Sequence, residues 1–198
     1  MFANRYAAFL DACVLAPVLS RNLLLSLAEA GFFRVLWSPT VLEETQRTIV
    51  RLLQERGRDA EQAGAIAADQ VRRMADAFPE AMVQDFDSLL PASDVLPDPG
   101  DAHVLAAALK ARAAVIVTDN LKDFPAATLA RFDLEARSAD DFVADSATLD
   151  MDRAVATVRR MRERFRRPEL TADQFLGKLE AVGLKETVRV LAPQAGSL

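Results

Sequence analysis

The stretch AVIVT at residues 114–118 decides the fold class of this chain, because all five residues are apolar or β-branched. A continuous run of this kind is typical of a parallel strand that is buried on both faces. Apolar runs at residues 7–10 and 32–37 predict two further strands, and residues 134–136 predict a short last one. Helical patterns separate these runs, so the sequence predicts an α/β sandwich of helices around a mostly parallel central sheet.

Helix signals fill the intervals in the first half of the chain. An apolar pattern at helical spacing follows Pro17 and ends at Gly31. Ser38 followed by a proline predicts the start of a second helix, with the serine as its cap. Residues 57–64 are polar and predict a loop, and the Ala-rich segment 65–78 predicts a helix after it.

The second half begins with the strongest helix-breaking region of the chain, residues 91–100. A helical pattern resumes from Asp101. Ser138, with Asp141 three residues later, predicts the start of another helix. After Leu149 the pattern is helical to the last residue.

Composition limits the class of protein. The chain has 198 residues, of which 51% are hydrophobic and 27% charged, so it can bury a core and is expected to form one domain with a small appendage. One cysteine and one histidine exclude an internal disulfide and a structural zinc site. The apolar stretch at residues 6–19 contains Asp11, which argues against a signal peptide or a membrane span and predicts a cytoplasmic protein.

Charge is distributed unevenly along the chain. Residues 1–150 carry 14 basic and 23 acidic side chains, a net charge of −9, whereas residues 151–198 carry 10 and 6, a net charge of +4. Seven arginines lie between Arg153 and Arg167. The sequence therefore combines an acidic body with a basic C-terminal segment.

Acidic residues follow the first three predicted strands or start the helix that leads into the third, and open parallel sheets bind their ligands at the carboxyl ends of their strands. They are Asp11, Glu43, Glu44, Asp98, Asp101, Asp119 and Asp123. Carboxylates that converge without a basic residue repel one another, and a divalent cation is the usual counter-charge. Oxygen ligands favour Mg²⁺ or Mn²⁺ over zinc, and such ions activate water for phosphodiester hydrolysis.

Several of these acids also have a structural explanation. Asp101 is placed to cap its helix, and Asp98 lies in a Pro-Asp-Pro-Gly turn. Glu43 is a candidate for a capping box, which makes Glu44 the better ligand. Asp11 has the weakest structural explanation, because it interrupts an apolar run. The single histidine, His103, is expected to be a packing or supporting residue rather than a base.

Four segments together resemble the PIN domain, the nuclease fold of VapC toxins in bacterial toxin and antitoxin pairs. They are FLDACVL at 9–15, WSPTVLEE at 37–44, DPGDAHVLAAA at 98–108 and IVTDNLKDFP at 116–125. No single segment is specific, but their order and intervals are. The resemblance implies a PIN-like three-layer sandwich and a site of Asp11, Glu44, Asp101 and Asp123. Asp119 is the alternative fourth acid or an assisting one.

The activity that the resemblance implies is that of an endoribonuclease that needs Mg²⁺ or Mn²⁺. It would cut RNA with water activated by one or two metal ions and without a covalent intermediate. The resemblance also implies a cognate antitoxin that covers the acidic site, a possible homodimer and no membrane association. Residues 1–148 are expected to form the nuclease domain, and residues 149–198 a helical extension similar to that of one VapC subgroup.

The arginines of this extension have three interpretations that the sequence leaves open. Arginine pairs with phosphate through a planar fork of donors, so a basic helix near an acidic site could hold RNA. The same side chains could bind an acidic antitoxin, or they could form the solvated face of a packed helix.

Two other functions remain as alternatives. A Mg²⁺-dependent phosphatase of the haloacid dehalogenase type needs a second aspartate two residues after the first, and Cys13 stands there. A noncatalytic PIN-like module for RNA or protein binding would lack one of the acids, whereas every matched position is filled. If the protein is such a module, we expect Mn²⁺ not to raise its melting temperature.

Overall fold

The computed structural model describes residues 6–93, 95–166 and 168–198. Arg167, one of the seven arginines counted above, lies outside the described residues. The chain forms two compact units, Met1–Pro17 with Arg34–Arg137 and Val18–Phe33 with Ser138–Leu198. Each unit therefore joins segments that lie far apart in the sequence.

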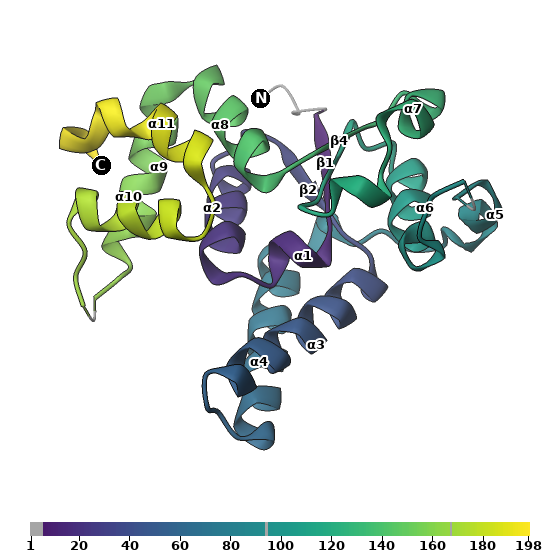
Figure 1. Ribbon diagram of the computed structural model, residues 1–198, viewed down its shortest axis with the longest axis horizontal. Coiled ribbons are helices and arrows are strands. Elements are labelled where there is room, and N and C mark those ends of the chain that lie inside the picture. Colours follow the sequence, from purple (N-terminus) through teal and green to yellow (C-terminus); the bar gives the residue numbers. More distant parts are fainter. Residues whose placement is uncertain (1–5, 94, 167) are drawn as a thin grey trace. The chain divides into compact units, whose positions relative to one another are not determined.

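The first unit is built on a parallel sheet of four strands in the order β2-β1-β3-β4 (Figure 1). The strands are β1 Ala7–Leu10, β2 Arg34–Leu36, β3 Val115–Val117 and β4 Glu135–Arg137. Ala8 of β1 lies opposite Val35 of β2 on one side and Val115 of β3 on the other. Every residue of β1 and β3 is buried, which confirms that the apolar runs form central strands.

The helices of this unit are α1 Ala12–Leu15, α3 Pro39–Glu55, α4 Ala60–Ala77, α5 Leu90–Ser93, α6 Ala102–Lys110 and α7 Ala126–Leu129. Ser38 caps α3 as predicted, because its Oγ accepts a hydrogen bond from Val41 N at 3.2 Å. The predicted loop at 57–64 is wrong in its second half. Asp59 caps α4 by accepting from Gln62 N at 2.8 Å, so the helix begins at Ala60. The helices α3 and α4 pack together as a hairpin (Figure 1).

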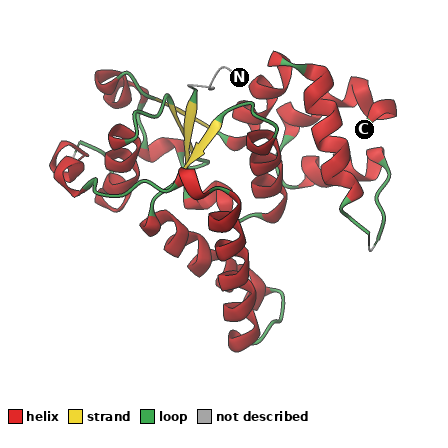
Figure 2. Cartoon of the chain, turned by 180° about the vertical axis from the view of Figure 1, so that it is seen from behind, coloured by secondary structure: helices red, strands yellow, loops and turns green. Residues whose placement is uncertain are grey.

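The second unit consists of helices (Figure 2). They are α2 Val18–Glu29, α8 Ala139–Leu149, α9 Met151–Glu163, α10 Ala172–Ala181 and α11 Lys185–Leu191. Helix α2 packs on α8 and α9, and α8 packs on α11. The helical pattern predicted after Leu149 is interrupted between α9 and α10, where Arg166 and Glu169 form an isolated β-bridge.

Asp140 ties the start of α8 to the start of α11. Its Oδ2 accepts from Glu186 N at 2.8 Å, and its Oδ1 accepts from Thr187 N at 2.7 Å. These two N–H groups have no partner inside α11, because they belong to its first turn. A single carboxylate therefore accepts hydrogen bonds from two free N–H groups in the first turn of a helix that lies 46 residues further along the chain.

Together the parallel sheet with its helices and the helical second unit confirm the predicted α/β fold with a helical C-terminal region. In the described parts of the chain, no helix is both long and apolar enough to cross a membrane.

Candidate functional site

Asp11 stands at the carboxyl end of β1 and is held by three hydrogen bonds. Its Oδ1 accepts from Ala12 N at 2.6 Å, which makes it the cap of α1. Its Oδ2 accepts from the Thr118 hydroxyl at 2.8 Å and from the Cys13 thiol at 3.1 Å. The side chain is 7% exposed. Asp11 is thus a buried carboxylate whose position is fixed by both central strands.

The sequence placed Thr118 at the end of a predicted strand but indicated no role for it in the site. Its Oγ accepts from Asn120 N at 3.1 Å while its proton goes to Asp11. The side-chain amide of Asn120 in turn donates to Asp123 Oδ2. A chain of hydrogen bonds therefore links the first acid of the predicted site to the last.

Asp101 precedes α6 but does not cap it. No capping hydrogen bond to its side chain is present, and its Oδ2 is buried with no hydrogen-bond partner in the described part of the chain. Burial raises the pKa of Asp101 to about 6, with further contributions from the charges of Asp11, Asp98 and Asp123. The interpretation of this residue as a helix cap is therefore wrong, and its buried oxygen has no structural use in the chain itself.

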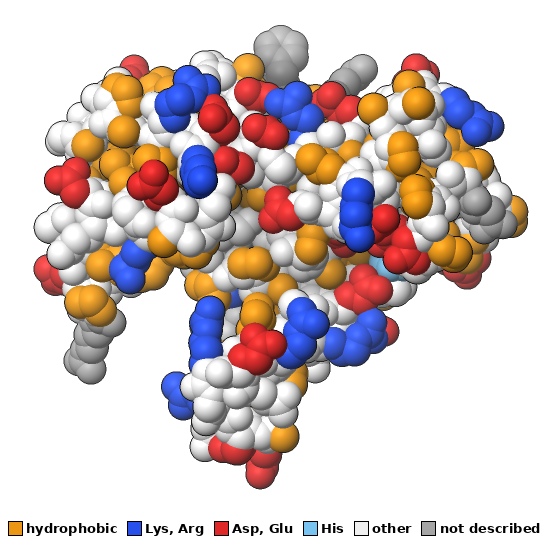
Figure 3. Space-filling view, in the orientation of Figure 1, with side chains coloured by type: hydrophobic (Ala, Val, Ile, Leu, Met, Phe, Trp, Pro, Cys, Tyr) orange, Lys and Arg blue, Asp and Glu red, His pale blue; other side chains and the backbone are white. Residues whose placement is uncertain are grey.

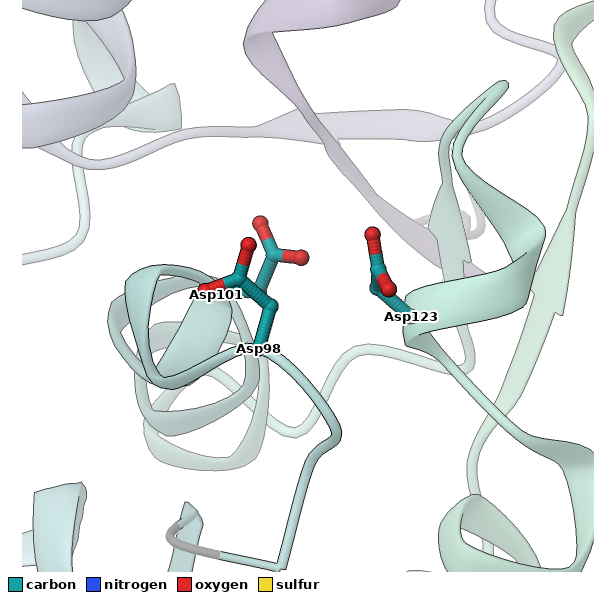
Figure 4. Close-up of side chains that lie close together, drawn as sticks. All are labelled: Asp98, Asp101 and Asp123. Carbon is teal, nitrogen blue, oxygen red and sulfur yellow. The ribbon is translucent and has the colours of Figure 1, made fainter.

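Three carboxylates meet beside the start of α6. Ligand oxygens of Asp98, Asp101 and Asp123 all lie within 4.8 Å of one another. Figure 4 shows them pointing into the same space, Asp98 and Asp101 from the turn before α6 and Asp123 from the opposite side. A gathering of acidic side chains is visible over this end of the first unit (Figure 3). Such a cluster of oxygen ligands could hold a divalent cation.

Asp98 takes part in both a turn and this cluster. Its Oδ1 accepts from Gly100 N at 2.8 Å, which confirms the turn interpretation. The sequence argument did not choose it as a ligand, because the turn explained it sufficiently. Its spacing of three residues from Asp101 is compatible with a shared ligand site but does not distinguish a ligand from a turn residue.

The other predicted acids lie outside the three-carboxylate cluster. Glu44 projects from α3, and its Oε1 lies 3.2 Å from His103 Nε2 and 3.8 Å from an Arg47 nitrogen. Asp119 is exposed, and its backbone N–H donates to Cys13 Sγ at 3.2 Å. Asp11 contributes to the electrostatics of the cluster through its charge on Asp101.

Hard divalent cations fit this set of ligands. The buried Asp101 oxygen lacks a partner among the described residues, and the pKa of Asp101 is raised first by burial and then by the charges of neighbouring aspartates, which a cation would offset. Cys13 is a poor candidate for a ligand, because its thiol donates to Asp11 and because burial and the Asp11 charge raise its pKa to about 12. The remaining oxygen donors are of the type that Mg²⁺ and Mn²⁺ prefer.

Comparison with known proteins places the chain among characterised families. Residues 139–193 match the VapC50 C-terminal domain, and residues 7–122, more than half of the chain, match the PIN domain. The second match includes Asp11, Glu44, Asp98, Asp101 and Asp119, and ends one residue before Asp123.

A curated protein of Mycobacterium tuberculosis (strain ATCC 25618 / H37Rv), named "Putative ribonuclease VapC50", is 39% identical over 79 residues. The alignment spans 40% of this chain and 47% of that protein, so it covers about half of the relative's length. No solved structure matches the chain. On the extent of the match at residues 7–122, the chain belongs to the PIN domain family and carries a VapC50 C-terminal domain after it.

Proposed function

We propose that the protein is a metal-dependent endoribonuclease of the VapC type. Asp11, Glu44, Asp101 and Asp123 would hold Mg²⁺ or Mn²⁺, with Asp98 and Asp119 assisting. The observation that carries the proposal is Asp101, whose Oδ2 is buried with no hydrogen-bond partner in the described residues and whose carboxylate lies beside those of Asp98 and Asp123. The name of the mycobacterial relative, a ribonuclease, supports the choice of reaction.

A divalent cation bound here would lower the pKa of water and offset negative charge on a phosphodiester. The residues of the chain position these groups. Asp11 keeps its orientation through three hydrogen bonds, and Asn120 orients Asp123. The Thr118 hydroxyl and the Cys13 thiol both donate to the Asp11 carboxylate, so neither is assigned the role of nucleophile. We therefore propose attack by water, without a covalent intermediate.

The acidic centre repels RNA, so the substrate needs basic contacts elsewhere. We place them at Arg160 and Arg164 of the second unit, which line a cavity of about 260 Å³ together with Ser26, Thr157 and Glu29. Arg160 and Arg164 contact the side chains of Thr157 and Glu29 at this cavity, whereas Arg159 and Arg162 donate to the backbone carbonyls of Ser197 and Leu170. An acidic antitoxin is the alternative ligand of the same two arginines.

The partners of the protein follow from its proposed class. We propose a cognate antitoxin that covers the acidic site, and self-association as a homodimer. The proposed division of labour assigns catalysis to residues 1–148 and the basic contacts to residues 149–198. We also propose that the reaction takes place in the cytoplasm.

The decisive experiment is the cleavage of total RNA by the purified chain, freed of any partner, with Mg²⁺, Mn²⁺ or EDTA. Discrete fragments are expected with either metal, and none with EDTA. Asp101→Asn should abolish them, whereas Asp173→Asn, an exposed aspartate of α10, should not. Fragments that persist in EDTA or in Asp101→Asn would contradict the proposal.

Thermal unfolding with Mn²⁺ separates the nuclease from the noncatalytic module. A metal that binds the folded state raises the melting temperature, and Asp101→Asn should reduce that increase. A chain that neither cleaves RNA nor gains stability with Mn²⁺ would be the noncatalytic binding module.

A further inference from the structure

His103 joins the helix that follows the acidic cluster to the helix that carries Glu44. It is the second residue of α6, two residues after Asp101. Its Nε2 lies 3.2 Å from Glu44 Oε1, and the two side chains are 15% and 31% exposed. The geometry assigns the proton to Nε2, which donates to the carboxylate.

Glu44 is engaged on one oxygen. Its two contacts in the described part of the chain, with His103 and with Arg47, both use Oε1. Arg47 is a weak competitor, because its side chain is 67% exposed and 3.8 Å away. The second oxygen, Oε2, is therefore left for another ligand.

Stability alone does not explain the imidazole. Its Nδ1 is buried and has no partner among the described residues. A buried acceptor without a hydrogen bond costs about 1–3 kcal/mol, whereas an apolar side chain at the same place avoids that cost. Two interactions distinguish histidine from such a side chain: the direct contact with Glu44 and a weaker charge interaction with Asp101.

We propose that His103 is a positioning residue for the cation site. By holding Oε1 of Glu44, it orients that side chain so that Oε2 is available to the ion held by the aspartates. Ligating groups are commonly fixed by a hydrogen bond of this kind from a neighbouring residue. The inference rests on the proposed function for the existence of the site, and it adds a residue that determines how tightly the ion is held.

The test is the dissociation constant of Mn²⁺ for the full-length chain, measured by electron paramagnetic resonance of free Mn²⁺ at one fixed pH. His103→Leu should weaken binding on the order of tenfold. His103→Gln should restore most of the affinity, because the glutamine amide can donate in place of Nε2. Metal-free melting should be no lower in His103→Leu than in the wild type, since the substitution removes the unpaired Nδ1.

A double-mutant cycle with Glu44→Gln identifies the route of the effect. If His103 acts through Glu44, His103→Leu adds little further loss in the Glu44→Gln background. Unchanged Mn²⁺ affinity in His103→Leu, or losses that simply add, would overturn the proposal. So would a His103→Gln variant that binds as weakly as His103→Leu while melting like the wild type.

RNA cleavage by the same samples distinguishes this inference from the proposed function. Wild-type protein that binds Mn²⁺ but cuts no RNA would contradict the nuclease, while the loss of affinity in His103→Leu would still support the positioning role. Cleavage with unaltered Mn²⁺ affinity in His103→Leu would support the nuclease and overturn the role of His103. A wild-type chain that binds no Mn²⁺ would overturn both.

Discussion

Asp101 is a carboxylate whose charge is opposed by its surroundings. Burial and three neighbouring aspartates raise its pKa from 3.8 to about 6. Between these values the folded chain binds more protons than the unfolded chain, so the free energy of unfolding must fall as the pH rises through this range. Above the folded pKa, the ionised Asp101 lowers the free energy of unfolding by its full amount. A nuclease site has to be ionised in this same pH range to hold a cation.

Asp101→Asn should remove this pH dependence. In the metal-free protein we expect the variant to be more stable than the wild type at about pH 7, by about 1 kcal/mol after allowance for solvent screening, and nearly equal to it at about pH 4. Urea unfolding at the two pH values measures the difference, with Asp173→Asn as the control. An Asp101→Asn variant that is destabilised equally at both pH values would show that the carboxylate has a structural role.

The site residues differ in how far sequence could identify them. Asp11 follows from its place at the end of a predicted strand and Asp101 from its place at the start of the helix that leads into the next strand, and the resemblance to PIN domains supports both. Asp98 could not be chosen, because a turn accounts for an aspartate there as well as a ligand does. The contact of His103 with Glu44 depends on how α3 and α6 are placed, which no local pattern contains.

At the scale of elements, helix α9 illustrates how a charged face divides into different roles. Replacement of Arg160 and Arg164 by glutamine should weaken RNA binding and lower the salt dependence of the affinity by about one to two units of slope. Replacement of Arg159 and Arg162 should mainly lower the melting temperature, because these two side chains hold backbone carbonyls. Filter binding over a range of salt concentrations gives the slopes.

If the Arg160 and Arg164 variant keeps the wild-type slope, these arginines do not bind RNA. A lost response to an acidic antitoxin would then assign them to the partner. An unchanged response to both would mean that they form a solvated face.

Helix starts were predictable where a cap precedes an apolar pattern. Ser138 opens α8 as expected, with Asp141 N donating to its Oγ at 3.1 Å and its hydroxyl donating to Asp141 Oδ2 at 2.7 Å. Asp59 went unrecognised because the first turn of α4 contains Glu61 and Gln62, so no apolar periodicity marks the beginning of that helix. Caps are thus visible in a sequence only when the residues behind them are patterned.

At the scale of the whole molecule, each of the two units combines segments that are distant in the sequence, and the sequence did not indicate this arrangement. Helix α2 follows β1 closely, yet it belongs with residues 138–198. Its amphipathic pattern predicts a helix with one buried face, but not which segment covers that face. The partner, α9, begins more than 120 residues after α2 ends.

A chain that ends at residue 148 should therefore fail to fold independently. It would lack α9 and α11, the helices that pack on α2 and α8. Leu23, Leu24 and Leu27 of α2 are fully buried, and each such side chain contributes about 1.5–3 kcal/mol by burial. We expect aggregation of this fragment on expression, whereas the full chain should melt cooperatively.

The contrary outcome would be informative as well. A fragment of residues 1–148 that stays monomeric, unfolds cooperatively and binds Mn²⁺ would make the nuclease an autonomous domain. The proposed functional division at this point would then coincide with a division in folding.

The position of α2 also has a consequence during synthesis. The ribosome completes this helix long before it makes α9, and at typical elongation rates the interval is on the order of ten seconds. For that time its leucines lack α9, one of the two helices that pack on α2 in the complete chain. A nascent chain with this connectivity offers a chaperone, or a partner translated nearby, an early hydrophobic target that vanishes when the last fifty residues emerge.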